Sequence, residues 1–266
     1  DINYFALIFA CWLCEAYYLP LSKNSSKENI SYQVKRSNVG IIVSYNKKFL
    51  FKKLKKRENK NSNKLAYIIF TSGSTGPKKG VKISNKNFIA YLKSLKHKFK
   101  NKFKSKSLLI NGEITFDIVN ADIAFALLYD CEICITEDSK NIFSLFDILE
   151  RRRVESVYAV PSMWENICFF ALSQNKKFNF IKNVNSGGEL LTLGLYRKIK
   201  SIAPKSTFHN FYGPTEFTIN ATCCEINDKN IKKGIVTDEN NNLSIGKPLK
   251  GVDLRIKSKK KILIGE

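Results

Sequence analysis

A glycine- and hydroxyl-rich stretch that begins at Thr71 has the composition of a phosphate-binding loop. It directly follows the apolar run 65–70, and its sequence is TSGSTGPKKG. Glycines let backbone N–H groups turn toward an anion, hydroxyl groups add donors, and a lysine supplies positive charge. The side chains suited to this are those of Ser72, Ser74, Thr75 and Lys79. The order GxxxxGK[ST] of a Walker A loop is missing, and the alternative is a flexible Ser/Gly-rich turn.

A second stretch, NFYGPTE from Asn210 to Glu216, could hold other parts of a nucleotide. An aromatic ring before a Gly-Pro turn can present a flat face to a base, as Tyr212 would here. The hydroxyl of Thr215 and the carboxylate of Glu216 can reach phosphate and a hard cation such as Mg²⁺. Taken alone, the stretch is also typical of a β-turn beside a core tyrosine.

Short apolar runs that alternate with amphipathic segments predict the elements that position these stretches. Strands are expected at 39–44, 65–70, 107–110, 131–136, 155–160 and 181–185. Helices are expected at 84–98, 117–128, 141–152, 162–172 and 192–202. Strands that are apolar throughout and are followed by helices are buried on both faces of a sheet. The pattern therefore predicts an α/β fold with doubly wound, mainly parallel sheets and flanking helices.

Lysine-rich segments interrupt this alternation. We interpret 46–64 and 96–106 as solvated loops or helix faces between sheet elements. From about residue 225 the pattern gives way to Asn/Lys/Gly turns with short alternating runs at 252–256 and 261–264. We therefore expect a small β subdomain to begin there.

The composition excludes several classes of protein. With 44% hydrophobic residues the chain is too apolar for a disordered or fibrous protein. The net charge of +22 comes from 45 Lys and Arg, of which seven are Arg, against 23 Asp and Glu. Nucleic-acid readers depend on Arg for bidentate base contacts, so this excess of Lys favours a solvated basic exterior over a nucleic-acid-binding surface.

The seven cysteines indicate a reducing compartment rather than a metal site. Two CxxC pairs, Cys11 with Cys14 and Cys131 with Cys134, lie in apolar runs and are not followed by His at ligand spacing. An odd, unpatterned count of cysteines argues against a disulfide framework. The apolar first twenty residues are interrupted by Asp1, Asn3 and Glu15, so we expect no membrane span.

The two stretches together resemble the ANL superfamily of adenylate-forming enzymes. The resemblance is strongest to amino-acid adenylation domains of nonribosomal peptide synthetases and to D-alanine carrier-protein ligases. The family loop is TSGSTGxPKGV, and this chain has TSGSTGPKKGV, with Lys78 in place of a Pro and Lys79 at the family's Lys. Further matches follow in the family's order: the segment 9–20 with the early helix and turn, Phe116-Asp117 with the FD pair, Ser186 to Glu189 with the GGE turn, and Ser244 to Leu249 with IGxPL.

This resemblance implies that ATP and a carboxylic acid react to give an acyl adenylate and pyrophosphate. The acyl group would then pass to the phosphopantetheine thiol of a carrier protein. The chemistry needs two anions to be aligned and their charge neutralised, without a covalent protein nucleophile. No Ser/His/Asp or Cys/His arrangement is recognisable in the sequence, which agrees with such a mechanism.

The resemblance also assigns roles to individual residues. The loop would hold the β- and γ-phosphates of ATP, Tyr212 would pack on adenine, Thr215 would touch the α-phosphate, and Glu216 would hold Mg²⁺. The expected catalytic residues are Thr71, Lys79, Thr215 and Glu216. The expected nucleotide-binding residues are Thr71, Ser72, Gly73, Ser74, Thr75, Gly76, Lys79, Gly187, Gly188, Glu189, Asn210, Phe211, Tyr212, Gly213 and Thr215.

Asp117 carries the expectation about the substrate. In amino-acid-activating members the Asp of the FD pair binds the α-ammonium group of the substrate. An alternative role, compatible with the first, is that Asp117 caps the helix 117–128. By the same alignment, the residues lining the substrate pocket would be Asp117, Ile118, Ala121, Ala159, Val184, Ser186, Phe211, Ile219 and Asn220. This mostly apolar lining favours a small or medium uncharged amino acid over a charged one.

The chain is expected to be part of a longer catalytic unit. The family continues after IGxPL with a ribose-binding Asp, a hinge and a small C-terminal domain whose Lys reaches the reacting groups, and it begins before the segment matching 9–20. We therefore expect an incomplete adenylation core at 1–235, the start of a small β subdomain at 236–266, and little turnover by this chain alone. The alternatives are an inactive nucleotide-binding remnant and a basic nucleic-acid-binding protein. ATP use and the cysteines favour a cytoplasmic location.

Overall fold

The computed structural model describes residues 2–54, 64–71, 78–136, 138, 141–234, 237–258 and 261–265. The chain forms two compact units. The first comprises Asp1–Ile89 with Ile114–Asp117, and the second comprises Ala90–Glu113 with Ile118–Glu266. The domain boundary predicted near residue 235 remains a prediction.

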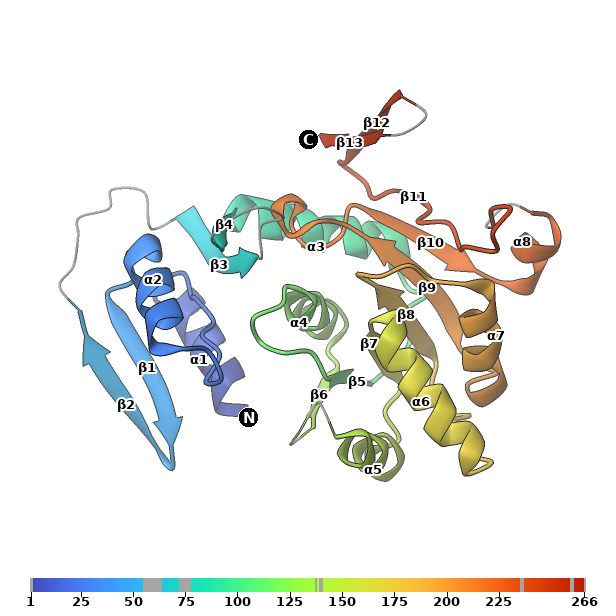
Figure 1. The fold of residues 1–266 in the computed structure, drawn as a ribbon, viewed down its shortest axis with the longest axis horizontal. Coiled ribbons are helices and arrows are strands. Elements are labelled where there is room, and N and C mark those ends of the chain that lie inside the picture. Colours follow the sequence, from blue (N-terminus) through green and yellow to red (C-terminus); the bar gives the residue numbers. More distant parts are fainter. Residues whose placement is uncertain are drawn as a thin grey trace. The chain divides into compact units, whose positions relative to one another are not determined.

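In the part of the first unit that the structure describes, helices α1 and α2 accompany two antiparallel hairpins (Figure 1). Helices α1 and α2 span Ile2–Leu13 and Lys27–Ser37, and strands β1 to β4 span Ile41–Asn46, Lys48–Lys53, Leu65–Thr71 and Lys79–Ser84. β1 pairs with β2, and β3 pairs with β4. The strands predicted at 39–44 and 65–70 therefore exist, but they lie in antiparallel pairs outside the parallel sheet, because each is followed by another strand rather than by a helix.

Aromatic packing anchors the strand that leads to the predicted phosphate loop. The indole N–H of Trp12 in α1 donates to the carbonyl of Ala66 in β3 at 3.1 Å. Its ring lies 5.4 Å from that of Phe88, which also contacts the buried ring of Tyr67. Burial of such rings contributes on the order of 2 kcal/mol each. These contacts anchor the beginning of β3, the strand that ends at Thr71.

The second unit is built on a seven-stranded sheet with the order β11-β10-β9-β8-β7-β5-β6. Strands β5 to β11 span Ser107–Ile110, Glu132–Ile135, Ser156–Ala159, Asn183–Gly187, Thr207–Tyr212, Thr222–Ile226 and Lys247–Pro248. Pairing is parallel from β6 through β5, β7 and β8 to β9, and antiparallel at β10 and β11. Every residue of β5, β7 and β8 is buried. The predicted α/β fold with a mainly parallel sheet is confirmed.

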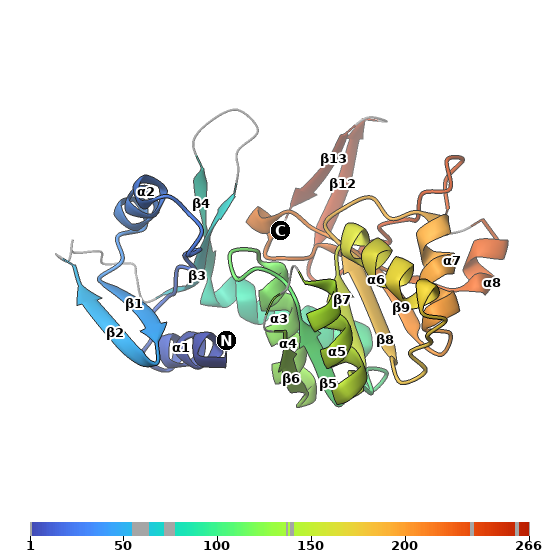
Figure 2. The same cartoon turned by 60° about the horizontal axis from the view of Figure 1, so that its bottom comes forward.

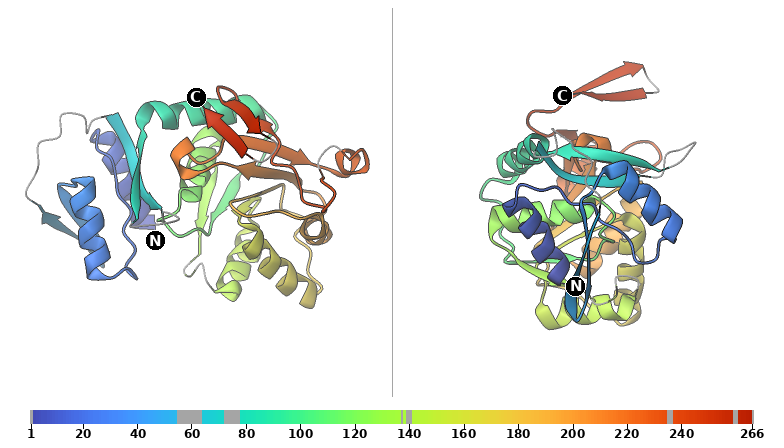
Figure 3. Two further views of the ribbon diagram at one scale, coloured as in Figure 1. Left: turned by 45° about the horizontal axis from the view of Figure 1, so that its top comes forward. Right: turned by 90° about the vertical axis from the view of Figure 1, so that its left-hand side faces the viewer.

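Helices cover both faces of this sheet (Figure 2). They are α3, which begins in the first unit and spans Asn85–Phe99, α4 (Ile118–Tyr129), α5 (Ile142–Arg152), α6 (Pro161–Ser173), α7 (Leu193–Ile202) and α8 (Asp228–Lys232). On one face Phe99 of α3 and Phe125 of α4 pack against Phe211 of β9. On the other, a cluster that includes Trp164 of α6 and Val184 of β8 joins α5, α6 and α7 to the sheet. The hairpin of β12 (Asp253–Ser258) and β13 (Lys261–Gly265) lies near the C-terminus (Figure 3).

The five predicted helices begin and end within one residue of α3 to α7. Side-chain caps account for three of the starts. The Ser84 hydroxyl before α3 accepts a hydrogen bond from the Asn87 N–H at 3.1 Å. The side chain of Asn141 accepts a hydrogen bond from the Phe143 N–H at 2.9 Å, and that of Thr192 accepts one from the Leu195 N–H at 3.3 Å. None of the helices described is both long enough and apolar enough to cross a membrane.

Several elements of the fold were not predicted, and one segment was assigned wrongly. The elements not predicted include α2, α8, β4, β9, β10 and β11. β9, for example, contains His209 and Asn210 and lacks a continuous apolar run. The segment 46–64, interpreted as solvated loop or helix face, contains β2 instead. All of β2 is exposed, but its Phe49 ring lies 5.0 Å from that of Tyr45, its partner across the hairpin. Residues 55–63 lie outside the described part of the chain.

A polar network joins the amino-terminal ends of β5, β7 and β8. The Glu155 carboxylate accepts a hydrogen bond from the Lys106 N–H at 2.6 Å and forms an ion pair with Lys182 at 2.7 Å. The Glu155 N–H donates to the Ser107 hydroxyl at 3.1 Å. Burial opposes ionisation of Glu155, but the contacts from Lys182 and Lys106 outweigh it and lower the pKa of the carboxyl.

We predict that Glu155→Gln lowers the free energy of unfolding at pH 7 by about 1 kcal/mol. Because the folded pKa lies below the ordinary value of 4.5, the contribution is complete above that value and is lost as pH falls through the folded pKa. The difference between wild type and variant should therefore shrink below about pH 4.5. Urea titrations at several pH values measure this, with the exposed Glu225→Gln as control. A difference independent of pH would contradict the assignment.

Candidate functional site

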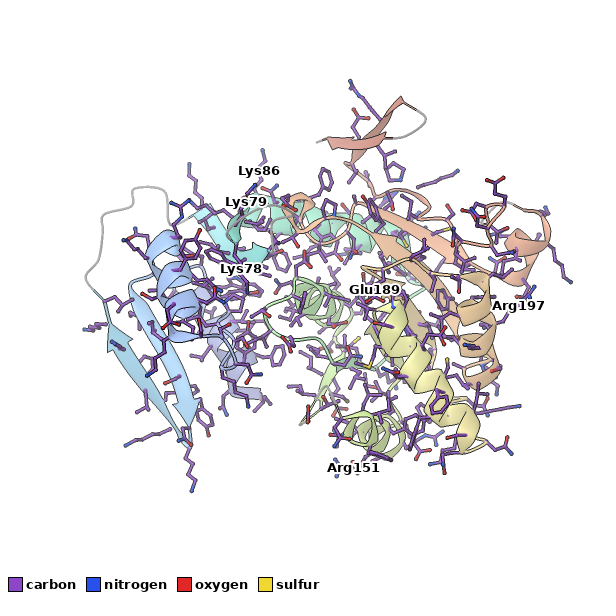
Figure 4. The ribbon with its side chains drawn as sticks, viewed as in Figure 1. Lys78, Lys79, Lys86, Arg151, Glu189 and Arg197 are labelled. Carbon is purple, nitrogen blue, oxygen red and sulfur yellow. The ribbon has the colours of Figure 1, made fainter. Side chains whose placement is uncertain are left out.

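The β3–β4 hairpin of the first unit holds the two ends of the predicted phosphate loop. Thr71, the last residue of β3, is the ladder partner of Lys79, the first residue of β4. Lys78 and Lys79 are exposed, and the Lys78 carbonyl accepts a hydrogen bond from the Tyr32 hydroxyl at 3.2 Å. Figure 4 shows both lysines on this hairpin and Lys86 at the start of α3. Ser72, Gly73, Ser74, Thr75 and Gly76 lie outside the described residues, so their contact with phosphate remains a prediction.

In the second unit, two of the predicted stretches leave the sheet side by side. β8 ends at Gly187 and β9 at Tyr212, and the register pairs Gly187 with Phe211. Because β8 and β9 are parallel neighbours, the GGE turn and the YGPTE stretch lie at the same, carboxyl edge of the sheet. Ligands of open α/β sheets bind at this edge. Both stretches were predicted to bind the nucleotide, and that role remains a prediction; β9, which positions one of them, was not predicted.

The loop between β9 and β10 is tight and strained. Its first residue, Gly213, has no room for a side chain, since a Cβ atom would lie 2.5 Å from the Ile219 carbonyl oxygen. Thr218 and Ile219 have φ values of 63° and 74°, in the left-handed region that β-branched residues rarely adopt. The Ala221 N–H closes the loop by donating to the Tyr212 carbonyl at 2.8 Å. Such strain persists only where the surrounding structure enforces it, and it is concentrated at functional sites.

This loop presents an accessible ring and carboxylate at the edge. Tyr212 is 40% exposed, which excludes the alternative of a core tyrosine. Thr215 and Glu216 lie in a one-turn 3₁₀ helix at Thr215–Phe217, Thr215 half-buried and Glu216 exposed. Among the residues described, Glu216 forms no ion pair, and no cluster of three His, Cys, Asp or Glu side chains is arranged to hold a metal.

Asn210 serves to attach the segment resembling IGxPL. Its side-chain amide donates to the Ser244 carbonyl at 3.0 Å, and the Thr222 hydroxyl of β10 donates to the Ile245 carbonyl at 2.6 Å. The Leu249 N–H donates to the Ala221 carbonyl at 2.8 Å. These bonds join β9 and β10 to the segment at 244–249 and so hold the residues that flank the strained loop.

Glu189, the last residue of the GGE turn, contacts the first turn of α6. Its carboxylate accepts hydrogen bonds from the Ser162 N–H and from the Ser162 hydroxyl, both at 2.9 Å. Figure 4 shows Glu189 at the start of α6, with Arg197 on α7 and Arg151 on α5. The sequence analysis gave Ser162 no role, because its partner is 27 residues away and no motif includes both.

Asn220 lies in a buried network with two tyrosines. Tyr158 of β7 donates its hydroxyl to Asn220 Oδ1 at 3.0 Å, and Asn220 Nδ2 donates to the Tyr91 hydroxyl of α3 at 2.8 Å. The Tyr158 ring lies 5.4 Å from that of Phe211. Both polar groups of the Asn220 amide are therefore engaged by the protein itself. Neither tyrosine was singled out by the sequence analysis.

The residues predicted to line a substrate pocket do not all gather on one side of the sheet. Ala159 and Val184 belong to the hydrophobic cluster under α5, α6 and α7, whereas Phe211 packs on the opposite face. Asp117 directly precedes α4, the position of a helix N-cap, and is half-buried. The other predicted residues are Ile118, which is half-buried, and the buried Ala121, Ser186, Ile219 and Asn220. The structure thus brings Phe211 and Asn220 together and separates them from Ala159 and Val184.

A buried histidine beside this network is not suited to acid–base chemistry. His209 of β9 is 6% exposed and lies against the ring of Phe99. Burial, together with the positive charges of Lys98 and Lys102, lowers the pKa of His209 to about 3. It is therefore neutral at physiological pH and cannot act as a proton carrier there.

Comparisons with known proteins give a family match over nearly the whole chain. The sequence profile of a family described as AMP-binding enzyme matches residues 2–263. The dapdiamide synthesis protein DdaD of Enterobacter agglomerans is 29% identical over 234 residues, which cover 85% of this chain and 40% of that protein. The D-alanine–D-alanyl carrier protein ligase of Lactococcus lactis is 29% identical over 209 residues, which cover 77% of this chain and 40% of that protein. The chain thus spans less than half the length of these relatives.

Solved structures share the fold at low sequence identity. The nonribosomal peptide synthetase FmoA3 superposes with a TM-score of 0.79 at 16% identity, covering 96% of this chain and 29% of that one. The O-succinylbenzoate coenzyme A synthetase of Bacillus subtilis, in complex with ATP and magnesium ion, gives a TM-score of 0.71 at 16% identity and covers 96% and 55% of the two chains. At this identity the likeness shows the fold alone.

We predict that Gly213→Ala lowers the free energy of unfolding by about 2–4 kcal/mol, because the new Cβ would collide with the backbone of the β9–β10 loop. Chemical denaturation measures the loss. The matched control is Gly194→Ala in α7, where the nearest atom lies 3.9 Å from the new Cβ and alanine favours the helix. Equal stability of the two variants would show that the loop is not held as described.

Proposed function

This chain belongs to the family of AMP-binding enzymes, and we propose that it takes part in the ATP-dependent activation of a carboxylic acid, namely an amino acid. The product would be an acyl adenylate, whose acyl group passes to the phosphopantetheine thiol of a carrier protein. The observation that carries the proposal is the parallel pairing of β8 with β9, which sets the GGE and YGPTE residues at one edge of the sheet. The carrier protein ligase among its relatives supports the acceptor.

The chemical task is to align two anions and to stabilise charge on the α-phosphate as the carboxylate attacks it. We assign Tyr212 to stacking on adenine, because its ring is accessible at the edge of the sheet. Thr215 would donate its hydroxyl to the α-phosphate. Thr71 and Lys79, at the two ends of the loop, would bind the β- and γ-phosphates, with Lys79 supplying a positive charge. No covalent bond to the protein is needed.

Glu216 fits the role of a magnesium ligand. Mg²⁺ is commonly bound by one or two carboxylates together with substrate phosphates and water. Glu216 is an exposed carboxylate at the end of β9, with no ion pair among the described residues. When bound, the cation would supply charge neutralisation for the phosphates. The task of Glu216 is then to hold it beside Thr215.

On the acyl side, we assign Asp117 to the α-ammonium group of an amino acid. The amide of Asn220 is already hydrogen-bonded to Tyr91 and Tyr158, so it offers little to a polar side chain of the substrate. Buried polar groups that are already paired favour an apolar ligand. A small uncharged amino acid therefore suits this site better than a large or charged one. Use of ATP is consistent with a cytoplasmic location.

We predict that Glu216→Gln weakens binding of Mg-ATP about tenfold or more, because a neutral amide is a poor ligand for Mg²⁺. Binding of ATP in the presence of EDTA should change little. Isothermal titration calorimetry on the purified chain measures both. Glu239→Gln, at an exposed turn, is the control. Unchanged Mg-ATP affinity in Glu216→Gln would count against the assignment.

The substrate class is tested with non-hydrolysable acyl-adenylate analogues, which need no turnover. Each aminoacyl analogue is paired with the same analogue lacking the α-amino group. Asp117→Asn should weaken the aminoacyl member about 10- to 100-fold and leave the desamino member unchanged, because it removes a charge-assisted contact to the ammonium group. Tight binding of fatty-acyl analogues alone would reject an amino acid as substrate.

A further inference from the structure

Glu189 supplies the cap that α6 lacks. The residue preceding the helix is Val160, which has no side-chain acceptor, and the first helical residue is Pro161. A helix begins with unpaired N–H groups and a partial positive charge, so an acceptor there is stabilising. The Glu189 carboxylate takes this place from a different segment, with one oxygen on the Ser162 N–H and the other on the Ser162 hydroxyl. We call these two bonds the Glu189–Ser162 clamp.

The clamp joins two loops that leave the same edge of the sheet. β7 and β8 are parallel neighbours, with Ala159 opposite Ser186 in the register. Ser162 follows the end of β7, and Glu189 follows the end of β8. Gly188, which lies between the end of β8 and Glu189, has a φ of 87°, a conformation that favours glycine. A Cβ at this position would lie 3.5 Å from a Val160 methyl group. The GGE turn therefore lies directly against the start of α6.

The chain after the turn is fixed at its far end. Leu191 is 1% exposed, and its carbonyl accepts a hydrogen bond from the Leu243 N–H at 2.8 Å. The next residue, Thr192, caps α7. Leu190, by contrast, is 69% exposed and gives the turn no buried anchor. The path from the end of β8 to Leu191 is thus held in its middle by the Glu189 carboxylate.

We propose that Glu189 is a positioning residue, and not a ligand of the nucleotide or of the acyl group. Both of its oxygens are engaged by Ser162, and through this clamp it sets the backbone of Gly187 and Gly188 beside Tyr212. Affinity for the nucleotide would then depend on Ser162, a residue outside every motif of the sequence. The role rests on the proposed function, since it assumes that ATP binds at this edge.

A double-mutant cycle tests this role. It comprises Glu189→Ala, Ser162→Ala and the double variant of the 266-residue chain, with Mg-ATP affinity and urea unfolding as separate readouts. Glu189→Ala should weaken Mg-ATP about five- to tenfold, the scale of a lost helix cap. Ser162→Ala should weaken it less, because the Ser162 N–H remains. The double variant should be no weaker than Glu189→Ala, because the two residues act as one unit.

Two further variants separate positioning from a general loss of stability. In Glu189→Gln the amide oxygen can still accept from the Ser162 N–H, and the amide NH₂ can donate to the Ser162 hydroxyl. Mg-ATP affinity should therefore stay within about threefold of wild type. Glu165→Ala, which removes an exposed ion pair with Lys198 farther along α6, should leave the affinity unchanged.

Three results would overturn the proposal. If Glu189→Ala weakens Mg-ATP while Ser162→Ala does not, and the effects add, Glu189 touches the ligand directly. If the cycle couples only in unfolding and no variant changes Mg-ATP affinity, the clamp is structural. If the wild-type chain binds no Mg-ATP, the proposed function fails and the positioning role fails with it. Coupling in unfolding would then still show that the clamp itself forms.

Discussion

The parallel pairing of β8 with β9 is the constraint on which the candidate site depends. Gly187 and Phe211 are ladder partners, so the residues that follow them must emerge at the same edge. β9 is packed into the core on both faces by buried ring contacts, Phe211 with Phe99 and Tyr158 on one face and Phe208 with Tyr196 on the other. Burial of such rings contributes on the order of 2 kcal/mol each, more than a backbone hydrogen bond at the edge would supply. The core therefore determines the relative position of two short polar loops.

The loops themselves are shaped by local constraints that no apolar core could impose. In the β9–β10 loop, two β-branched residues, Thr218 and Ile219, take left-handed backbone conformations. Bonds from Asn210 and Thr222 to the segment 244–245 hold the strands that flank this loop. A site preorganised in this way has less to reorder when it binds a charged ligand. This edge of the sheet thus holds a few exposed groups, among them Tyr212 and Glu216, in fixed positions.

Burial decided how much of the fold could be predicted from the sequence. β5, β7 and β8 are buried throughout and apolar enough to be recognised, and α5 between them is amphipathic and begins at the side-chain cap Asn141. β9 was missed because it buries His209 and Asn210, whose polar side chains interrupt the apolar run that would indicate a buried strand. The strands at 39–44 and 65–70 were expected in the parallel sheet but pair within hairpins, because a single run of residues does not specify its pairing partner. Likewise, the contacts of Glu189 with Ser162 and of Asn220 with Tyr91 join residues 27 and 129 positions apart, which spacing alone could not reveal.

Photolabelling with 2-azido-ATP in the presence of Mg²⁺, followed by peptide mapping, locates the adenine without requiring turnover. If the nucleotide binds at the carboxyl edge of β8 and β9, label on the chain will be found in peptides containing Tyr212 or residues 187–189, and excess unlabelled ATP will prevent it. Competable label confined to peptides elsewhere, or no competable label at all, would contradict the placement of the nucleotide at the carboxyl edge of β8 and β9.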